Sequence, residues 1–405
     1  MIIRAKVVAT MDGPPIENGA VAVLGERLVD VGKLSDVAHK YSGVETVDLG
    51  EQVLLPGLIN AHCHLDYTCL RGKIPRQKSF TDWIHAINAA KAKLLVDDYV
   101  ASINEGFTEA KRFGTTTIVN LTAFPELISK INEPIRTWWF AEHIDVRDPS
   151  QANELVDSAV EHLKSRPRWG LAPHAPFTAS ADLYRRSEEI AQRENVLLTT
   201  HLAESHEEMS MFRDATGELY DFLKEIGRDM NDCGGRTPLQ WVLQDTASPA
   251  RTRPYLLVHL NELASNDFKL LKESAASDSI VHCPRSHNYF GHSPFQFQKL
   301  CELGFNICLG TDSLASNDKL SLFAEMRAFQ KEFPDVWPHE ILKMVTVNPA
   351  LALQQENALG KIRAGFVADL IAVSVASSTS VFQELIDFEG SVSWTMIGGI
   401  AQKAA

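Results

Sequence analysis

Three features are missing from this sequence: a secretory leader, a long hydrophobic run and a cysteine-pairing pattern. The N-terminus, MIIRAKVVATMDG, has no basic segment followed by an apolar core and a small-residue cleavage site. No run of about 18 apolar residues occurs, so no membrane span is expected. The six cysteines form no CxxC pair and are expected to be reduced thiols, most of them buried. They are Cys63, Cys69, Cys233, Cys283, Cys301 and Cys308. We therefore expect a cytoplasmic protein without disulfides.

An excess of positive charge is missing as well. The formal net charge is -13. Binding to a phosphate backbone takes its affinity from clustered Lys and Arg, so no nucleic-acid partner is expected. Hydrophobic residues make up 45% and charged residues 22% of the chain, an ordinary balance for a globular enzyme. At 405 residues the chain exceeds the usual size of one compact core, which predicts one large domain with a smaller attachment.

Several catalytic signatures are also absent. No GxGxxG turn follows the first strand, which disfavours a doubly wound dinucleotide-binding sheet, the structural alternative for this chain. No GxSxG elbow or P-loop occurs. The H-x-E and P-C-x-x-C signatures of the cytidine-deaminase type of zinc site are missing too. The chemistry must therefore come from another arrangement of residues.

Eight short apolar runs lie between residues 56 and 355, and longer amphipathic segments separate most of them. This alternation predicts a parallel (β/α)8 barrel, the TIM-barrel fold, over residues 56–355. The expected strands are Leu58–Ala61, Thr116–Leu121, Thr137–Phe140, Trp169–Ala172, Val196–Thr200, Tyr255–Val258, Ser279–Val281 and Asn306–Leu309.

Both ends of the chain have β character. The first 55 residues contain two apolar runs, at 2–10 and 20–31, separated by the turn-forming Asp12-Gly13-Pro14-Pro15. After residue 355, β patterns return at 359–362, 368–374 and 391–400. We expect residues 1–55 and 356–405 to pair into one small β-sandwich domain beside the barrel. The segment 227–253 is expected to be a long loop on the functional face.

The strongest chemical signal is the motif Asn60-Ala61-His62-Cys63-His64-Leu65-Asp66. Because side chains alternate along a strand, His62 and His64 project to one side, about 6–7 Å apart. Two imidazoles on one side can reach a single divalent ion. The pair closes an apolar run, which places it at the C-terminal end of a strand, where barrel active sites lie. The alternative is a pair of histidines facing a polar loop.

Three further strands end in ligand-type residues. His201 closes one run, and Glu204 follows where the chain turns into a loop, a position that suits a proton shuttle beside a metal site. His259 and Asp312 close two other runs. Each has a plain alternative: a solvated Glu, a satisfied core His or a helix N-cap. Four strands that all end in His or Asp nevertheless point to one site.

His174 follows the fourth strand and is expected to face the pocket, although a His held in a Pro-braced turn is the alternative. His282, His287 and His292 are expected to lie in loop structure. No lysine stands at the end of the fourth strand, where a carbamylated ligand could bridge two metals. One metal is therefore expected.

The sequence resembles the amidohydrolase superfamily over nearly its whole length. The resemblance rests on LLPGLINAHCHLD, THLAES, His259, HCPRS, LGTDSLASN and GKIRAGFVADLIAVS. Within the superfamily, it is similar to the branch of cytosine, guanine, S-adenosylhomocysteine/methylthioadenosine and aminodeoxyfutalosine deaminases and the s-triazine chlorohydrolases. The resemblance implies one divalent ion, with Zn favoured over Fe or Mn, and a homo-oligomer.

The resemblance also implies roles for individual residues. The metal ligands would be His62, His64, His201 and Asp312. Glu204 would be the proton shuttle, and His259 would lie beside the attacking water. Substrate contacts would come from His174 in PHAPFT, Trp83 in SFTDW, Ser286 and His287, the last standing where many members have Asn.

The function implied is hydrolytic deamination of an aminated heterocycle, with hydroxide activated by the metal attacking the ring carbon that bears the amino group. An adenosine-type nucleoside is the expected substrate: methylthioadenosine, S-adenosylhomocysteine or aminodeoxyfutalosine. The alternatives are triazine chloro- or aminohydrolysis, guanine or cytosine deamination, and opening of a cyclic amide. A non-catalytic scaffold is the remote alternative.

Overall fold

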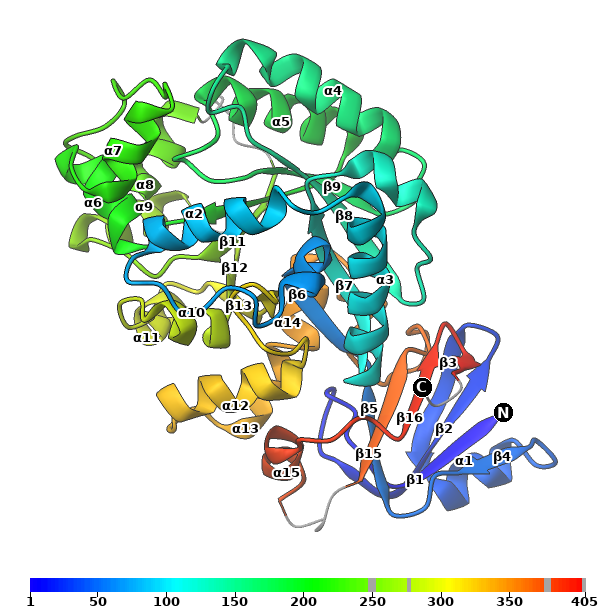
Figure 1. Ribbon diagram of the computed structural model, residues 1–405. Coiled ribbons are helices and arrows are strands. Elements are labelled where there is room, and N and C mark those ends of the chain that lie inside the picture. Colours follow the sequence, from blue (N-terminus) through cyan, green and yellow to red (C-terminus); the bar gives the residue numbers. More distant parts are fainter. Residues whose placement is uncertain (247–252, 275–277, 375–379, 403–405) are drawn as a thin grey trace.

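The computed structural model describes residues 1–246, 253–274, 278–374 and 380–402, and its largest element is a barrel of parallel strands (Figure 1). The strands follow each other around the barrel in chain order, and β14, which continues β13, pairs with β6 and closes the sheet. The predicted (β/α)8 barrel and its eight strands are therefore confirmed. The strands are β6 (Leu58–His64), β7 (Thr115–Thr122), β8 (Arg136–His143), β9 (Trp169–Pro173), β10 (Leu197–Leu202), β11 (Tyr255–His259), β12 (Ser279–His282), β13 (Asn306–Leu309) and β14 (Asp312–Ser313).

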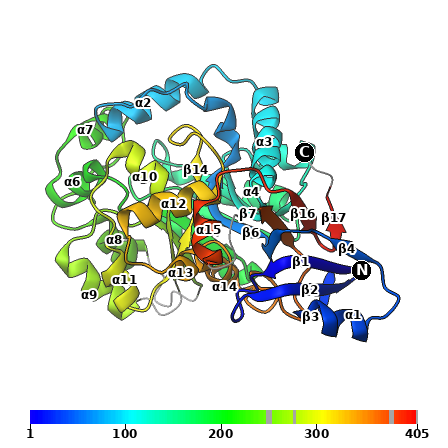
Figure 2. The same ribbon diagram turned by 90° about the horizontal axis from the view of Figure 1, so that it is seen from below.

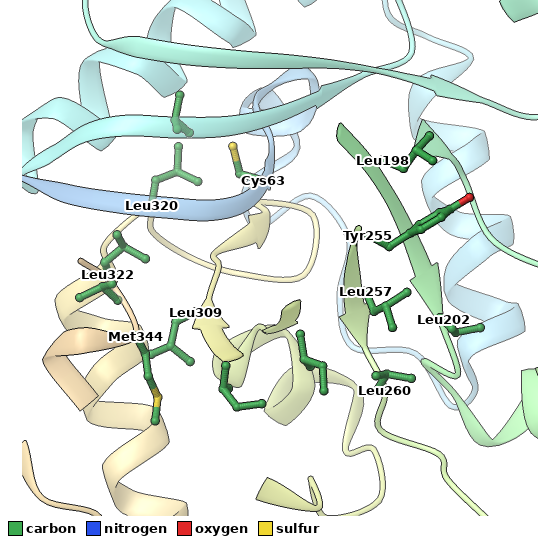
Figure 3. Close-up of a cluster of buried hydrophobic side chains, with 14 of the residues drawn as sticks. Cys63, Leu198, Leu202, Tyr255, Leu257, Leu260, Leu309, Leu320, Leu322 and Met344 are labelled. Atoms are coloured by element: carbon green, nitrogen blue, oxygen red, sulfur yellow. The ribbon is translucent and has the colours of Figure 1, made fainter. Parts of the chain in front are cut away.

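The barrel strands are buried on both faces, which explains why they appear in the sequence as continuous apolar runs. Neighbouring residues belong to two different cores: on β10, Leu197 joins the core inside the barrel, whereas Leu198 joins the layer between strands and helices. Figure 3 shows part of this outer layer, with Leu198, Leu257 and Leu309 on three different strands. Helix α14 (Val347–Ala352) adds apolar residues to the inner core.

Helices surround the strands, as the view from below shows (Figure 2). Their ends carry the expected local signals: α5 begins after Ser180, whose side chain accepts a hydrogen bond from the Leu183 amide, and ends at Asn195 in the left-handed conformation. The α-helices are α2 (Phe80–Lys91), α3 (Val96–Arg112), α4 (Ala152–Leu163), α5 (Ala181–Glu194), α6 (His206–Asp214), α7 (Glu218–Glu225), α8 (Pro238–Trp241), α9 (Ser265–Ser274), α10 (Pro284–Phe290), α11 (Phe297–Glu302), α12 (Leu322–Glu332) and α13 (Pro338–Lys343). Short 3-10 helices are η1 (Leu65–Leu70), η2 (Pro125–Lys130) and η3 (Pro149–Gln151), and η4 (Val242–Thr246) is a π-helix.

Segments from the two ends of the chain form a second sheet beside the barrel (Figures 1 and 2). Strand β5 joins the two ends, because it pairs in parallel with β1 and antiparallel with β15. Both ends contribute buried apolar side chains to one cluster of this sheet. Its elements are β1 (Ile2–Val8), β2 (Ile16–Leu24), β3 (Arg27–Lys33), β4 (Thr46–Asp48), β5 (Gln52–Pro56), β15 (Leu370–Ser374), β16 (Trp394–Ile397) and β17 (Ile400–Ala401), with helices α1 (Leu34–Lys40) and α15 (Val381–Asp387).

Some local expectations were wrong. The run at 20–31 is not one strand: a turn at Gly25, with φ 57°, separates β2 from β3. Residues 359–362 form no strand. The predicted loop at 227–253 contains α8 and η4, while 247–252 lie outside the described residues. The domain boundaries at 55/56 and 355/356 remain a prediction.

The described cysteines are all free, and Cys63, Cys283 and Cys308 are buried. Among the described residues, the structure contains no helix that combines the length and the apolar character needed to cross a bilayer.

Candidate metal centre and active site

The first strand of the barrel places two histidines at the centre of the molecule. In the pairing of β6 with β7, Asn60 lies opposite Ile118 and Cys63 opposite Asn120, so β6 carries one extra residue. Such a bulge redirects the side chains that follow it. His62 is fully buried, and His64 is 7% exposed, with their ring centroids 4.9 Å apart. Both imidazoles therefore lie together, as the HxH spacing predicts.

The other strand ends bring further donor atoms to these two rings. The Nε2 atoms of His64 and His201 are 3.2 Å apart. Asp312 Oδ1 lies 3.7 Å from His62 Nε2 and 3.8 Å from His64 Nε2. Ligands of a tetrahedral zinc site at bond lengths near 2.0–2.1 Å are separated by roughly 3.3 Å. The four predicted metal ligands thus converge at a spacing that fits one small cation.

The protonation of these rings favours a cation as well. Burial lowers the pKa of His201 to about 4 and the pKa of His64 well below its usual range, so both rings are neutral at neutral pH. Neither ring nitrogen of the fully buried His62 has a hydrogen-bond partner. Neutral imidazole nitrogens that face each other without a shared proton fit a divalent ion between them.

Asp312 is held by its own backbone and by hydrogen bonds to its carboxylate. Its φ is 54°, a left-handed conformation that is uncommon outside glycine. The Ser286 hydroxyl donates to Oδ2 at 2.7 Å and the Ser313 amide to Oδ1 at 2.8 Å. Burial raises the Asp312 pKa, but the electrostatic influence of the nearby His62, His259 and His64 outweighs it and holds that pKa well below its usual range. The carboxylate is therefore ionised at neutral pH.

Glu204 and His259 complete the cluster on the far side of Asp312. His259 Nε2 lies 3.6 Å from Glu204 Oε1, and donor atoms of Glu204, His259 and Asp312 lie within 4.8 Å of one another. Burial, together with the charges of Asp312 and Glu208, raises the Glu204 pKa well above its usual range. Burial also keeps His259 neutral by lowering its pKa. Glu204 is therefore a protonated acid at neutral pH, the form in which it can donate a proton.

A cavity of about 280 Å³ opens onto these groups. His64, His201, Glu204, His259 and Asp312 line its polar floor. The outer wall is mostly apolar and comes from α2, α7 and the loops after β8 and β9. That wall includes Phe80, Trp83, Ile84, Ile87, Phe177, Phe222, Leu223 and Ile226. An apolar cleft with a few convergent polar groups is the usual form of a small-molecule site.

The predicted substrate contacts divide into two groups. His174 and Trp83 line the cavity. Ser286 and His287, in contrast, lie in α10 and do not line it within the part of the chain that the structure describes. Ser286 bonds to Asp312, and His287 Nδ1 lies 3.1 Å from Asn261 Oδ1, whose amide group bonds the Glu204 carbonyl. Ser286 therefore contacts a residue of the cavity floor directly, and His287 contacts the floor through Asn261; neither residue faces the cavity itself.

The three histidines expected in loop structure lie partly elsewhere. His282 is the last residue of β12 and stacks on Phe295 at 4.0 Å, and His287 lies in α10, so the expectation was wrong for these two. His292 follows α10, and its Nε2 lies 3.9 Å from Glu204 Oε1. The proline after Cys283 starts the helix, which is why this segment is not a loop.

Among the charged residues that line the cavity, sequence reasoning missed Glu142, Lys91 and Arg147. Glu142 is the penultimate residue of β8, in the stretch Arg136–His143. A ligand-type residue at the end of an apolar run is the same signal that identified His201 and Asp312, so it was available in the sequence. Lys91 closes α2 and carries no comparable signal.

Fold and cluster together define a class: parallel-barrel hydrolases that hold a divalent metal at the C-terminal ends of the strands. Comparison with known proteins then gives the family. The Amidohydrolase family model matches residues 53–401, and the chain belongs to this family.

Relatives and solved structures agree with the family. The chain is 30% identical over 381 residues to a 5-methylthioadenosine/S-adenosylhomocysteine deaminase of Syntrophobacter fumaroxidans, covering 89% of this chain and 81% of the relative. Helicobacter pylori aminofutalosine deaminase in complex with methylthio-coformycin has a TM-score of 0.87 at 21% identity, covering 99% of this chain and 100% of that one. A zinc-bound adenosine deaminase from Xanthomonas campestris has a TM-score of 0.80 at 24% identity, covering 99% and 92%. These two structures share the fold.

Proposed function

We propose that this protein is a metal-dependent hydrolytic deaminase of an adenosine-type nucleoside. The observation that carries the proposal is the geometry at the floor of the cavity, where a protonated acid, Glu204, lies beside the ionised Asp312 and the neutral His259. Deamination of a ring carbon needs both a proton donor for the ring nitrogen and an acceptor for the proton of water. The named activity of the Syntrophobacter relative supports the substrate class.

His62, His64, His201 and Asp312 would hold one divalent ion, and zinc is the ion we propose because neutral imidazoles and a carboxylate suit it. When bound, such an ion makes hydroxide available from water near neutral pH by lowering the pKa of water from about 15.7 toward about 7. The zinc reported for the Xanthomonas structure supports this choice.

The side chains of this protein account for the proton movements. Asp312 accepts a proton from water as the water oxygen attacks the ring carbon that bears the amino group, while His259 orients that water. Glu204 donates its proton to the adjacent ring nitrogen. When the carbon–nitrogen bond breaks, the new hydroxyl returns a proton to Glu204, and Asp312 protonates the departing amino group. Ammonia leaves, and both carboxyl groups regain their starting state.

The cavity walls explain how a planar heterocycle would be held. Trp83 stacks on Phe80 with ring centroids 5.9 Å apart, and the pair forms part of the apolar wall. His174 also lines the cavity, and its Nδ1 is 2.5 Å from the Thr178 hydroxyl oxygen. This contact fixes the ring of His174, which we propose as a substrate contact.

The test is ammonia release by the purified protein after analysis of its metal content. The substrates would be adenosine, methylthioadenosine, S-adenosylhomocysteine, aminodeoxyfutalosine, guanine, cytosine and a chlorotriazine. We expect ammonia from one or more of the adenosine-type nucleosides, with about one metal ion per chain. Release of chloride from the triazine without ammonia from any nucleoside would replace the proposal with the alternative chlorohydrolase function.

Two further properties belong to this proposal. We place the enzyme in the cytoplasm as a homo-oligomer, by analogy with the family. Light scattering of the purified protein gives the mass in solution, and a mass of one chain contradicts the oligomer.

A further inference from the structure

Glu142 takes no part in the proton movements described above, although its carboxyl group is close to the metal centre. The side chain is 7% exposed, lies near the end of β8 and lines the cavity. Its Oε1 has no hydrogen-bond partner, yet it lies 3.8 Å from His64 Nδ1. A buried acceptor without a partner destabilises a folded chain. Such a group needs a structural explanation.

The orientation of His64 supplies one. Its Nε2 lies 3.2 Å from His201 Nε2 and 3.8 Å from Asp312 Oδ1, so this nitrogen faces the metal centre. Its Nδ1 therefore faces the other way, toward Glu142. An imidazole that binds a metal through Nε2 carries its hydrogen on Nδ1, and that N–H needs an acceptor.

A second histidine of the site already shows this arrangement. His201 Nδ1 lies 3.0 Å from the backbone carbonyl oxygen of His174, which fixes the tautomer that leaves Nε2 free. For His64 the nearby acceptor is a carboxyl group rather than a carbonyl. Carboxylate acceptors behind metal-binding histidines orient the ring and make it a stronger ligand.

We propose that Glu142 is the positioning residue for His64: its carboxylate accepts the Nδ1 hydrogen and holds the ring in the orientation and tautomer that bind the metal. This inference rests on the metal centre of the proposed function. The observed separation of 3.8 Å between Nδ1 and Oε1 is about 1 Å longer than a charge-assisted hydrogen bond, so the proposal requires this gap to close when a metal ion is bound. Glu142 thereby stabilises the bound ion without contacting it.

Glu142 has a competing assignment, because it lines the substrate cavity. A substrate contact predicts that its loss raises KM and leaves metal binding unchanged. A positioning role predicts weaker metal binding even when no substrate is present. The affinity for zinc in the absence of substrate therefore separates the two assignments.

The experiment measures zinc affinity by competition with a chromophoric chelator for the wild type and three variants. Glu142→Leu removes the acceptor, and its affinity should fall about 10- to 100-fold. Glu142→Gln keeps an acceptor oxygen, and its affinity should stay within a few-fold of the wild type. Glu154→Gln is the matched control, because Glu154 lines a neighbouring cavity that Glu142 also borders but is itself exposed. This control should bind zinc like the wild type.

A spectroscopic measurement completes the test. In zinc-loaded wild type, the ¹⁵N resonance of His64 Nδ1 should have the shift of a strongly hydrogen-bonded N–H, and this shift should be lost in Glu142→Leu. If Glu142→Leu does not fold, Glu142→Asp takes its place, since it withdraws the carboxylate by one methylene. Wild-type zinc affinity in either variant would overturn the proposal. Absence of ammonia release with an unchanged pattern of zinc affinities would overturn only the deaminase assignment.

Discussion

The barrel and the terminal sheet are both built from buried strands, but they differ in whether their buried polar side chains have hydrogen-bond partners. Among the described residues, every buried side-chain polar atom without a hydrogen-bond partner lies between His62 and Glu332, in or around the barrel. The strands of the terminal sheet contribute none, and a cluster of buried apolar side chains packs between them. The barrel therefore retains costly unpartnered polar groups, whereas the described strands of the terminal sheet do not.

Left-handed backbone conformations occur at the functional end of the barrel. His259 has a φ of 79° and Asp312 a φ of 54°, both at the ends of strands. Conformations of this kind cost about 1–3 kcal/mol each and persist only where the surrounding structure holds them. The difference between the two regions teaches that the proposed catalytic cluster depends on its surroundings for its geometry. Four substitutions test this comparison.

The largest effect is expected for His62→Ala. The variant loses a proposed metal ligand, so its bound metal and its ammonia release should both fall to background. The substitution also removes two buried nitrogen atoms that have no hydrogen-bond partner. The unfolding temperature of the metal-free variant should therefore be no lower than that of the metal-free wild type. Metal analysis, the ammonia assay and thermal unfolding after chelation measure these effects. Full metal content in the variant would remove His62 from the ligand set.

Glu204→Gln is expected to reduce kcat by about 10²- to 10⁴-fold, because the amide cannot donate the proton that the ring nitrogen needs. Metal content and stability should stay at the wild-type level, since Glu204 is not among the proposed ligands. Steady-state kinetics with the preferred nucleoside give the measurement. Turnover at the wild-type rate would transfer the proton-donor role to another group.

The terminal sheet should show the opposite behaviour. Leu54→Ala on β5 removes a fully buried side chain from the apolar core and should lower the free energy of unfolding by about 2–5 kcal/mol. Its kcat/KM should be that of the wild type at a temperature where the variant is folded. Leu24→Ala is the matched control, because Leu24 is 74% exposed. A lower kcat/KM with an unchanged free energy of unfolding would show that the terminal sheet contributes to activity rather than to stability.

The smallest effect concerns the pH dependence of stability. Burial raises the pKa of Glu325 to about 8, even though the amide of Arg285 and the side chain of Asn317 donate to its carboxyl group. The folded chain therefore keeps a proton that the unfolded chain releases, so Glu325 lowers stability as the pH rises from its ordinary pKa toward about 8.

Glu325→Gln removes this titration, and its stability should fall less steeply over that range than the stability of the wild type. Urea unfolding at about pH 5, 6.5 and 8 gives the slopes. Glu389→Gln is the control, because its side chain is 80% exposed. Equal slopes for the wild type and Glu325→Gln would show that Glu325 is ionised in the folded chain.

The barrel was predictable from sequence because its strands are buried on both faces and therefore stand out as short apolar runs. The site was partly predictable for a related reason: His64, His201 and Asp312 each end such a run, and parallel strands bring their C-terminal ends together. That these residues bind a metal remains a prediction, although the geometry brings their donor atoms into one cluster.

Other features depend on contacts between residues far apart in the chain. Nothing in the local sequence shows that Ser286 would bond Asp312 or that Glu142 would lie behind His64. The bulge in β6 is similar, because it is a property of the pairing with β7 rather than of β6 alone. In the terminal sheet, the missed turn at Gly25 lies between two apolar runs so closely spaced that they resemble one strand.

The position of β5 between β1 and β15 has a consequence for the order in which the protein forms during translation. Strands β1 to β5 leave the ribosome first, whereas β15 begins only at Leu370. The whole barrel is synthesised between β5 and β15. Until β15 is made, one hydrogen-bonding edge of β5 has no partner strand, and an unpaired edge can pair with another chain. The strands that follow the barrel therefore complete a sheet that the strands before the barrel began, and they cover an edge that could otherwise pair with another chain.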